Sequence, residues 1–414
     1  YKDKNYIEMT ILARKLGKNP ILVIEQIDDV KRIIKAVKDL GASPILGVRT
    51  KLSSKSSGRW KNSSGDKSKF GLSIPEIMTT IYQLREANLL NEVKLLHFHI
   101  GSQISDIKVI KDSLQEASQI FVELSKLGAN MQFIDVGGGL GIDYDGSKTS
   151  SNNSTNYSLQ NYANDVVATL KDTCKSNNIL EPIIISESGR SIISHSSMLI
   201  FNVLGTSSVQ DELDSFKDNN SLIINNLKAT LSQLKEIDSD SVDISDIIEL
   251  WNDAKKFKED SLTSFRLGFI SLEERAYAEQ ITCACAKEIT KIIQINDLNH
   301  SDLNDIKTVL ASTYYGNFSV FKSLPDSWAI NQVFPIMPIH RHTERPIFKG
   351  SFADLTCDSD GKLDTFISNG DVEPLINLHQ KVDNKDYYFA IFMSGSYQEA
   401  LGNLHNLFGN TNII

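Results

Sequence analysis

Apolar positions along residues 1–190 follow two alternating spacings, and each spacing predicts a different element. Apolar residues at every third or fourth position predict amphipathic helices, whereas short continuous apolar runs predict buried strands. The helical spacing covers residues 5–16, 28–40, 74–90, 107–127 and 159–176. The apolar runs between them cover residues 20–25, 43–49, 95–100, 131–136 and 182–187. Helix and strand therefore alternate along this whole region.

Continuous apolar strands that alternate with helices are typical of a parallel sheet covered by helices. Several of the runs end in polar, glycine-bearing segments, at residues 99–103, 137–145 and 187–190. A (β/α)8 barrel of the TIM type carries its chemistry at such strand ends. We therefore expect an α/β fold with part of a TIM-type barrel, whose remaining strands would precede Tyr1.

The pattern changes after residue 206. Residues 221–234, 242–257 and 272–293 have helical spacing and many charges, which predicts a helical insertion that serves packing or assembly. Strand-like runs return at residues 318–321, 333–337, 350–357 and 388–393 and predict a separate β domain. The expected domains are a barrel at 1–206, the insertion at 207–310 and the β domain at 311–414.

Composition narrows the class of protein. The chain has 414 residues, 41% of them hydrophobic, and a mean hydropathy of -0.20, as expected for a soluble globular protein. Its net charge of -9 argues against a nucleic-acid partner or an anionic membrane surface. The four cysteines show neither zinc-ligand spacing nor a disulfide pattern, because Cys283 and Cys285 are too close together. A reducing cytoplasm is the expected location.

The strand at 131–136 runs into three glycines, Gly137, Gly138 and Gly139. Bare amides at a strand end are a favourable place for a phosphate, whose oxygens accept from backbone N–H groups. A dinucleotide-binding fingerprint fails, because its spacing requires a glycine where Ile142 stands. The alternative is a tight turn without a ligand.

Polar side chains at the other strand ends suggest chemistry. His97 and His99 point to the same side of a strand, either as hydrogen-bonded core residues or as ligands. Ser102 could bind phosphate. Glu187 could hold a protonated heterocycle nitrogen and Arg190 a phosphate, or the two could form a local ion pair.

Two features outside the barrel also carry polar groups. The run from Asp143 to Gly146 resembles the start of a calcium loop but lacks the remaining ligands, which favours a turn. Cys357 beside Asp358 is a candidate proton donor with a carboxylate neighbour. The alternative is a buried small apolar residue.

These segments together resemble the biosynthetic arginine decarboxylases, which are fold-III, alanine-racemase-like enzymes that depend on pyridoxal phosphate. The resemblance covers nearly the whole chain, and the helical insertion fits it too. The motifs occur in order as HFHIGSQ (97–103), FIDVGGGLGIDY (133–144), SESGR (186–190), YGNFSVFKSLPDSW (315–328), TCDSDGKLD (356–364) and YQEALGNLHNLFG (397–409).

The resemblance implies a role for each matching residue. His99 would stack on the pyridine ring and Glu187 would pair with the ring nitrogen, so that the ring can accept electrons when CO2 leaves. Cys357 would donate a proton and Asp358 would meet the cationic end of L-arginine, both in a neighbouring subunit's site. The phosphate would lie among Ser102, Gly138, Gly139, Gly189, Arg190 and Tyr397.

The implied product is agmatine, in polyamine biosynthesis, and the implied enzyme is a homo-oligomer with active sites at the subunit interface. Mg2+ is a further cofactor that the resemblance suggests, although no dedicated ligand set is visible. Besides Asp358, the implied substrate-binding positions are Ile134, Asp135, Val136, Gly137, Gly138, Gly139, Leu140, Gly141, Ile142, Asp143 and Tyr144.

One departure from the family is serious. The lysine that forms a Schiff base with the cofactor lies in the family's first barrel strand, and Lys51, Lys55, Lys67 and Lys69 do not match its motif. We expect a sequence truncated at both ends, whose full-length parent is the enzyme and which is inactive by itself. A minor departure is Ser396, where the family usually has alanine, with little expected effect.

Three alternatives remain open. An ornithine or diaminopimelate decarboxylase shares the chemistry, but those enzymes pass almost directly from barrel to β domain. A regulator that has lost its cofactor would explain the missing lysine, but it has no need for Glu187, Arg190, His99 and Cys357 together. A metal-dependent barrel hydrolase would use His97, His99 and Asp143.

Overall fold

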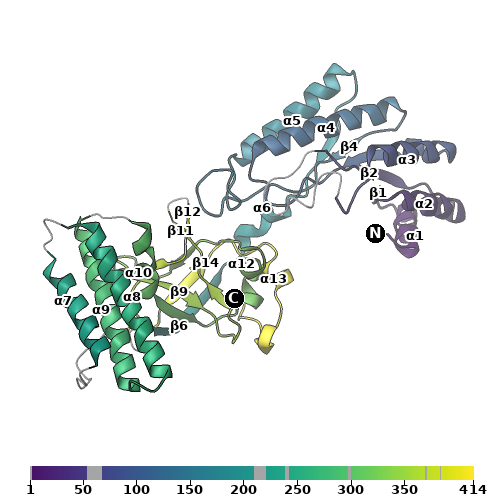
Figure 1. The fold of residues 1–414 in the computed structure, drawn as a ribbon. Coiled ribbons are helices and arrows are strands. Elements are labelled where there is room, and N and C mark those ends of the chain that lie inside the picture. Colours follow the sequence, from purple (N-terminus) through teal and green to yellow (C-terminus); the bar gives the residue numbers. More distant parts are fainter. Residues whose placement is uncertain are drawn as a thin grey trace.

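The computed structural model describes residues 2–53, 68–208, 221–237, 242–296, 300–368, 371–382 and 384–414, without the side chain of Asn304. These residues form three units, which Figure 1 shows side by side. An α/β unit holds the N-terminus, a β unit lies in the middle, and a bundle of long helices projects from the β unit.

The α/β unit confirms the alternation expected from the apolar spacing. Its five strands form one sheet in the order β1-β2-β3-β4-β5, and every neighbouring pair is parallel. The strands are β1 (Ile21–Ile24), β2 (Ile45–Arg49), β3 (Val93–His97), β4 (Phe133–Asp135) and β5 (Ile183–Ile185). The helices are α1 (Lys4–Lys15), α2 (Ile27–Leu40), α3 (Ile74–Glu86), α4 (Ile107–Lys126), α5 (Leu159–Ser176) and the short α6 (Gly189–Ile193).

Local sequence signals fix where several of these helices begin and end. The side chain of Asp3 accepts a hydrogen bond from the Tyr6 amide at the start of α1. Ser73 and Glu76 form a capping box at the start of α3, which satisfies backbone N–H groups that the helix leaves unpaired. Gly41, with φ +56°, ends α2 in the left-handed conformation that glycine tolerates.

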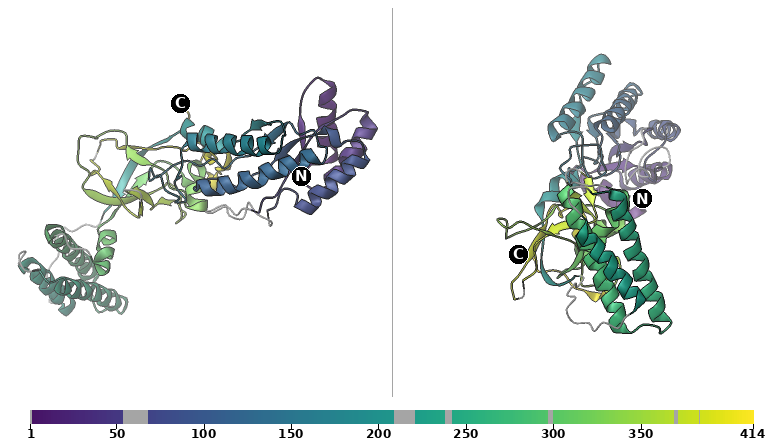
Figure 2. Two further views of the ribbon diagram at one scale, coloured as in Figure 1. Left: turned by 90° about the horizontal axis from the view of Figure 1, so that it is seen from above. Right: turned by 60° about the vertical axis from the view of Figure 1, so that its left-hand side comes forward.

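The helices cover the sheet because each presents an apolar face to it. Ile11 of α1, Ile33 of α2, Ile81 of α3 and Phe121 of α4 are fully buried in one core with the strand residue Ile134. Helices α4 and α5 pack side by side on this core, as Figure 2 also shows. The packing leaves the carboxyl ends of the strands together at one edge of the sheet.

The helical insertion is confirmed as a bundle of α7 (Leu222–Glu236), α8 (Ile244–Arg266) and α9 (Leu272–Asn296). It has its own core, which includes Leu227, Trp251 and Ile281. Trp251 donates its indole N–H to Asp305 at 2.9 Å, and this bond joins α8 to the short α10 (Asn304–Val309). Figure 2 shows the bundle standing away from the α/β unit.

The β unit is built on a second, mixed sheet that begins earlier in the chain than expected. Strand β6 (Leu199–Ser207) is antiparallel to both β7 (Ser312–Gly316) and β14 (Tyr388–Ile391). We therefore propose that the β domain begins with β6, on the N-terminal side of the helical insertion, and not at residue 311. The other strands are β8 (Ile336–Pro338), β9 (Phe348–Ala353), β10 (Lys362–Leu363), β11 (Phe366–Ser368), β12 (Asp371–Glu373) and β13 (Ile376–Leu378).

One expected strand of the β unit is wrong. Residues 318–321 run into a short helix, α11 (Val320–Ser323), because the Ser319 side chain caps it by accepting from the Lys322 amide. The strand in this region is β7, just before. The runs expected at 333–337, 350–357 and 388–393 overlap β8, β9 and β14. Two more short helices follow, α12 (Pro325–Ile330) and α13 (Gln398–Leu401).

Among the described residues, no helix combines the length and the apolar character that a membrane crossing requires.

Candidate active site

The parallel sheet brings charged side chains together where its strands end. In its register Arg49 lies opposite His97, and His97 lies opposite Asp135. Asp135 in turn lies opposite Ile185, two residues before Glu187. Because side chains two apart on an extended chain point the same way, Glu187 is directed to the same side as these neighbours. One edge of the sheet thus collects a cation, an imidazole and two carboxylates.

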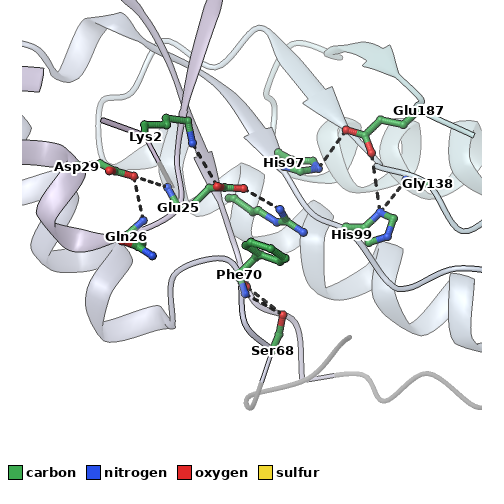
Figure 3. Close-up of polar contacts among 11 residues, drawn as sticks. Lys2, Glu25, Gln26, Asp29, Ser68, Phe70, His97, His99, Gly138 and Glu187 are labelled. Atoms are coloured by element: carbon green, nitrogen blue, oxygen red, sulfur yellow. Dashed lines mark hydrogen bonds and ion pairs between the residues drawn. The ribbon is translucent and has the colours of Figure 1, made fainter. Parts of the chain in front are cut away.

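Glu187 lies between the two predicted histidines (Figure 3). Its carboxylate oxygens lie 3.7 Å from His97 Nε2 and 3.9 Å from His99 Nδ1. The Glu187 side chain is 51% exposed, so the far side of the carboxylate is open to a ligand. Within the described part of the chain, Glu187 forms no ion pair with Arg190, which argues against the local Glu–Arg pair.

Both histidines are held in the neutral form. Burial, reinforced by the Arg49 charge, lowers the pKa of His97 to about 4. Burial also lowers the pKa of His99, although the charge of Glu187 opposes that shift. His99 Nδ1 accepts the Gly138 N–H at 3.1 Å, so its ring proton is on Nε2. The two contacts with Glu187 are therefore contacts of neutral imidazoles and not ion pairs.

His97 differs from His99 because its ring is not anchored by a hydrogen bond at Nε2, which is buried and has no hydrogen-bond partner among the described residues. A buried polar atom without a partner is costly, and its position next to Glu187 leaves it facing the same edge of the sheet. Asp135 is also perturbed, because burial and the Glu187 charge raise its pKa to about 6, against the Gly137 hydrogen bond.

The three glycines form a turn in which two positions, Gly137 and Gly139, fit only glycine. Gly137 has φ +65°, and a Cβ there would overlap the carbonyl oxygen of Phe98. Gly139 has φ +107°, and a Cβ there would lie 3.0 Å from the carbonyl oxygen of Gly101. The Gly137 carbonyl accepts from the Glu187 amide at 2.9 Å. The turn therefore ties the ends of β3, β4 and β5 together.

Arg190 is the centre of a second polar group. The residue is 95% buried, and its guanidinium donates from Nε and Nη2 to the Ser102 hydroxyl, at 3.3 and 3.2 Å. A third donor, Nη1, reaches the Tyr144 hydroxyl at 3.2 Å. The Tyr397 ring lies 4.8 Å from the guanidinium carbon. Ser102, Arg190 and Tyr397, which come from three distant parts of the sequence, are thus brought together.

The β domain supplies Tyr397 by a close backbone approach. The Gly395 amide donates to the Ser194 carbonyl at 3.0 Å, just after α6. A Cβ on Gly395 would overlap the carbonyl oxygen of Ile193, so a larger residue could not approach this closely. Gly189, at the start of α6, has no such constraint.

Most apolar side chains of the glycine-rich stretch belong to the two cores. Ile134, Val136 and Leu140 lie in the core of the α/β unit. Ile142 and Tyr144 lie in the core of the β unit, so the stretch joins the two units. Asp143 accepts from the Ser154 hydroxyl at 2.6 Å. Gly141 would bring a Cβ against Thr155. Within this stretch, Asp135 lies beside Glu187, and Gly137 and Gly138 lie beside His99.

A charged network beside the site was not foreseen from the sequence. Glu25, just after β1, pairs with Lys2 at 3.2 Å (Figure 3). It also pairs with Arg49 at 2.7 Å. Burial alone would raise the pKa of Glu25, but the two cations lower it. Sequence position gave a usable signal, because Glu25 and Arg49 each end an apolar run, as Glu187 does.

Two of the four lysines of the polar loop, Lys51 and Lys69, are among the described residues, and neither forms an ion pair with Glu187. The Lys51 amide donates to the Leu72 carbonyl at 2.9 Å, and the Lys69 ammonium lies 5.2 Å from the centre of the Phe70 ring. Lys55 and Lys67 fall outside the described residues.

Cys357 and Asp358 lie in the turn between β9 and β10. Cys357 is exposed, so the buried alternative is wrong, while Cys174, Cys283 and Cys285 are buried. The Asp358 carboxylate accepts from His405 Nε2 at 3.1 Å. Sequence reasoning missed His405, which lies 47 residues away along the chain.

Among the described residues, one group has the geometry for a metal ion, and it consists of His97, Asp135 and Glu187. It shares only His97 with the set expected for a metal-dependent hydrolase, because Asp143 and His99 are not in it. A divalent ion there would use the same carboxylate that faces the two histidines.

Comparisons with known proteins agree with this architecture. Residues 1–194 match the pyridoxal-binding domain of pyridoxal-dependent decarboxylases, and residues 217–307 match the arginine decarboxylase helical bundle domain. The chain is 71% identical, over its whole length, to a biosynthetic arginine decarboxylase of Prochlorococcus marinus subsp. pastoris. It spans 64% of the length of that relative.

Solved structures give the same result for the fold. A biosynthetic arginine decarboxylase from Campylobacter jejuni is 34% identical with a TM-score of 0.82, and the match covers 99% of this chain and 64% of that one. A diaminopimelate decarboxylase from Helicobacter pylori has a TM-score of 0.58 at 17% identity, over 98% of this chain and 69% of that one, and shares the fold alone. The partial TIM-type barrel with a helical insertion and a β domain is therefore confirmed.

Proposed function

The chain belongs to the biosynthetic arginine decarboxylase family, and from that premise we propose that the protein containing it decarboxylates L-arginine to agmatine and CO2. Agmatine formation would serve polyamine biosynthesis. The proposed cofactor is pyridoxal phosphate, and the observation that carries this proposal is the position of Glu187. Its carboxylate lies between two neutral histidines, one of which accepts the Gly138 N–H of the glycine turn.

The described residues fit this cofactor at both of its ends. His97 Nε2 is buried, has no hydrogen-bond partner in the part of the chain that the structure describes, and lies 3.7 Å from the Glu187 carboxylate. It is therefore placed to support that carboxylate when a ligand is bound. The glycine turn provides space next to His99 that a side chain would fill. At the other end, a buried guanidinium with two hydroxyl neighbours, on Ser102 and Tyr144, has the charge and donors that a phosphate requires.

We assign the cofactor-holding roles as follows. His99, as a neutral ring, would stack on the pyridine face, and Glu187 would keep a proton at the ring nitrogen. The phosphate would be held by residues around the buried Arg190. These are Ser102, Gly138, Gly139, Gly189, Arg190 and Tyr397. When bound, the cofactor supplies an electron sink for the electrons left on Cα after CO2 departs.

The remaining steps fall to residues of the β domain. Cys357 would return a proton to Cα, and its exposure leaves the thiol free to reach a substrate. Asp358 would bind the guanidinium end of arginine by paired N–H···O hydrogen bonds. We propose that both act in the site of a second subunit, as the family resemblance implies, so that the active enzyme is a homo-oligomer.

The substrate's path would lie along the glycine-rich stretch. Asp135 is partly exposed, and Gly137 and Gly138 lie next to His99. The other positions of residues 134–144 would contribute by shaping the turn, because their side chains are largely in the cores.

The cellular location and a requirement for Mg2+ are also proposals. We place the enzyme in the cytoplasm, since its four cysteines are free thiols. For Mg2+, the cluster at Glu187 is a poor candidate, because it includes an imidazole and Mg2+ prefers an octahedron of oxygen ligands. Assaying the enzyme with a chelator, with and without added Mg2+, tests the requirement.

The competing decarboxylases are distinguished by substrate. The match of residues 217–307 to an arginine decarboxylase helical bundle favours arginine over ornithine or diaminopimelate. We expect the full-length protein to release CO2 from arginine far faster than from the other two amino acids. The 414-residue chain, produced alone, should release none, because its lysines do not match the Schiff-base motif.

The experiment compares Glu187→Gln with Glu181→Gln in the full-length protein. Glu181 is an exposed glutamate just before β5 and serves as the matched control. We expect Glu187→Gln to lower kcat at least a hundredfold and Glu181→Gln to leave it unchanged. Equal activity of the two variants, or no agmatine from the unmodified protein, would refute the proposed function. A regulator without cofactor would show no turnover and no visible absorption band from bound pyridoxal phosphate.

A further inference from the structure

We propose that His405 and Asn406 are positioning residues that hold Asp358 and Cys357 in place, and that His405 thereby sets the preference for a guanidinium over an ammonium group. The proposal rests on the function proposed above, because it concerns how Asp358 meets the substrate. Neither residue carries a role in that proposal.

Two side-chain contacts join the segments. His405 Nε2 lies 3.1 Å from Asp358 Oδ2, and the Asn406 amide donates to Cys357 Sγ at 3.4 Å. A carboxylate is only an acceptor, so the proton of this bond belongs to His405 Nε2. Successive residues of one segment therefore contact the two successive residues that would act on the substrate.

The segment that carries His405 is itself fixed. The Asn403 amide donates to the Phe321 carbonyl at 3.1 Å, and the Asn403 side chain accepts from the His405 amide at 2.9 Å. The His405 ring packs on the buried Phe321 ring, with centroids 4.3 Å apart. Asn406 and Leu407 adopt φ of +54° and +61°.

The turn that carries Asp358 is also braced from its other side. Asp354 is buried and accepts from the Thr356 amide and hydroxyl, both at 2.7 Å. Its second oxygen accepts from the Val320 amide at 2.8 Å. Asp354 thus fixes the backbone of the turn, whereas His405 fixes the orientation of the carboxylate at its tip.

The orientation matters because of the lone pairs that it leaves. Asp358 Oδ1 accepts from the Asp360 amide at 3.0 Å, and Oδ2 accepts from His405. A carboxylate has about four acceptor positions, so one remains on each oxygen. Two acceptors in a fixed plane match the two parallel N–H donors of a guanidinium. An ammonium group is a compact charge with no such fork, so it gains less from the fixed plane.

The inference predicts a loss of discrimination when His405 is removed. In the full-length protein with cofactor, His405→Ala should raise the KM for arginine about tenfold, with a smaller change in kcat, since one charge-assisted hydrogen bond is lost. The KM for ornithine, measured as a weak alternative substrate, should change by less than about threefold. His405→Gln, whose amide can still donate, should recover much of the arginine KM.

A binding measurement separates this role from turnover. Cys357 is the exposed cysteine, so its alkylation by iodoacetamide can be followed by mass spectrometry while Cys174, Cys283 and Cys285 serve as buried references. Agmatine should protect Cys357, and the half-protecting concentration should rise about tenfold in His405→Ala. The matched control is His300→Ala, which removes an exposed histidine 3.9 Å from Asp302 in the helical insertion.

The outcomes are distinct. Parallel increases in KM and in the half-protecting concentration for His405→Ala, with none for His300→Ala, support the inference. Normal arginine turnover and protection in both His405→Ala and His405→Gln overturn it and leave the proposed function intact. Arginine and ornithine KM values that rise together overturn the guanidinium preference. An unmodified enzyme that neither turns over arginine nor is protected by agmatine overturns both.

Discussion

Replacing Gly137 with alanine should destabilise the sheet edge that carries Glu187. Gly137 has φ +65°, and the new Cβ would lie less than 3.0 Å from the carbonyl oxygen of Phe98. That oxygen belongs to the backbone, so it cannot move aside as a flexible side chain could. The Gly137 carbonyl also accepts from the Glu187 amide, so a shift of the turn displaces Glu187 as well.

The loss of stability expected for Gly137→Ala has two parts, which a control variant can separate. A left-handed alanine costs roughly 1–2 kcal/mol, partly offset because alanine restricts the unfolded chain more than glycine does. Overpacking against a fixed neighbour adds about 1–3 kcal/mol. Gly17 has φ +74° and nothing within 4 Å of an added Cβ, so Gly17→Ala carries only the first part. Gly137→Ala should therefore lose about 1–3 kcal/mol more folding stability than Gly17→Ala.

Hydrogen exchange measures this difference in the right part of the molecule. The helix before Gly17 contributes Ile7 and Ile11 to the core that also holds Ile134 of β4, so peptides from β3 and β4 report on both variants. Since 1.4 kcal/mol is a factor of ten, exchange in Gly137→Ala should be about 5- to 150-fold faster than in Gly17→Ala. Equal exchange rates in the two variants would show that the close approach to Phe98 is unimportant.

Three further predictions concern buried polar groups, and thermal denaturation of the cofactor-free protein tests each. The lowered pKa of His97, about 4, means that its contribution to stability is complete above pH 6.5 and is lost as the pH falls towards 4, so His97→Gln should flatten that decline. The raised pKa of Asp135, about 6, gives the opposite pH dependence, because the ionised carboxylate lowers the stability of the folded protein as the pH rises from 4 to 6. Asp135→Asn should therefore be the more stable form at pH 8 and equal to the parent at pH 4. The buried Ser396 hydroxyl has no partner among the described residues, so Ser396→Ala should be neutral or stabilising by up to about 1 kcal/mol. These assignments would be contradicted if the stability difference between His97→Gln or Asp135→Asn and the parent did not change with pH. A clear loss of stability in Ser396→Ala would contradict the third prediction.

The α/β unit was predictable because most of its strands carry apolar side chains on both faces of the sheet, even in the partly exposed strand β5. Such strands are continuous apolar runs, and a polar residue at the end of each run marks the functional edge of a parallel sheet. Glu187, His97 and His99 can therefore be identified from the sequence alone. Strand β6 of the β unit is half-exposed, and it was missed for that reason. Its buried residues Leu199, Phe201 and Val203 alternate with more exposed ones, and nothing nearby in the sequence reveals the partners, β7 and β14.

The same physical difference explains which site residues were missed. A residue at the end of an apolar run can be placed from local sequence, because the parallel sheet determines its neighbours. His405 has no such context, since it lies in an irregular segment whose position depends on Phe321 and on left-handed residues after it. Its contact with Asp358 is set by tertiary packing over 47 residues and not by any periodicity. The residues that orient a functional group are for this reason harder to predict than the group itself, and here they are also the ones whose substitution would separate substrate preference from catalysis.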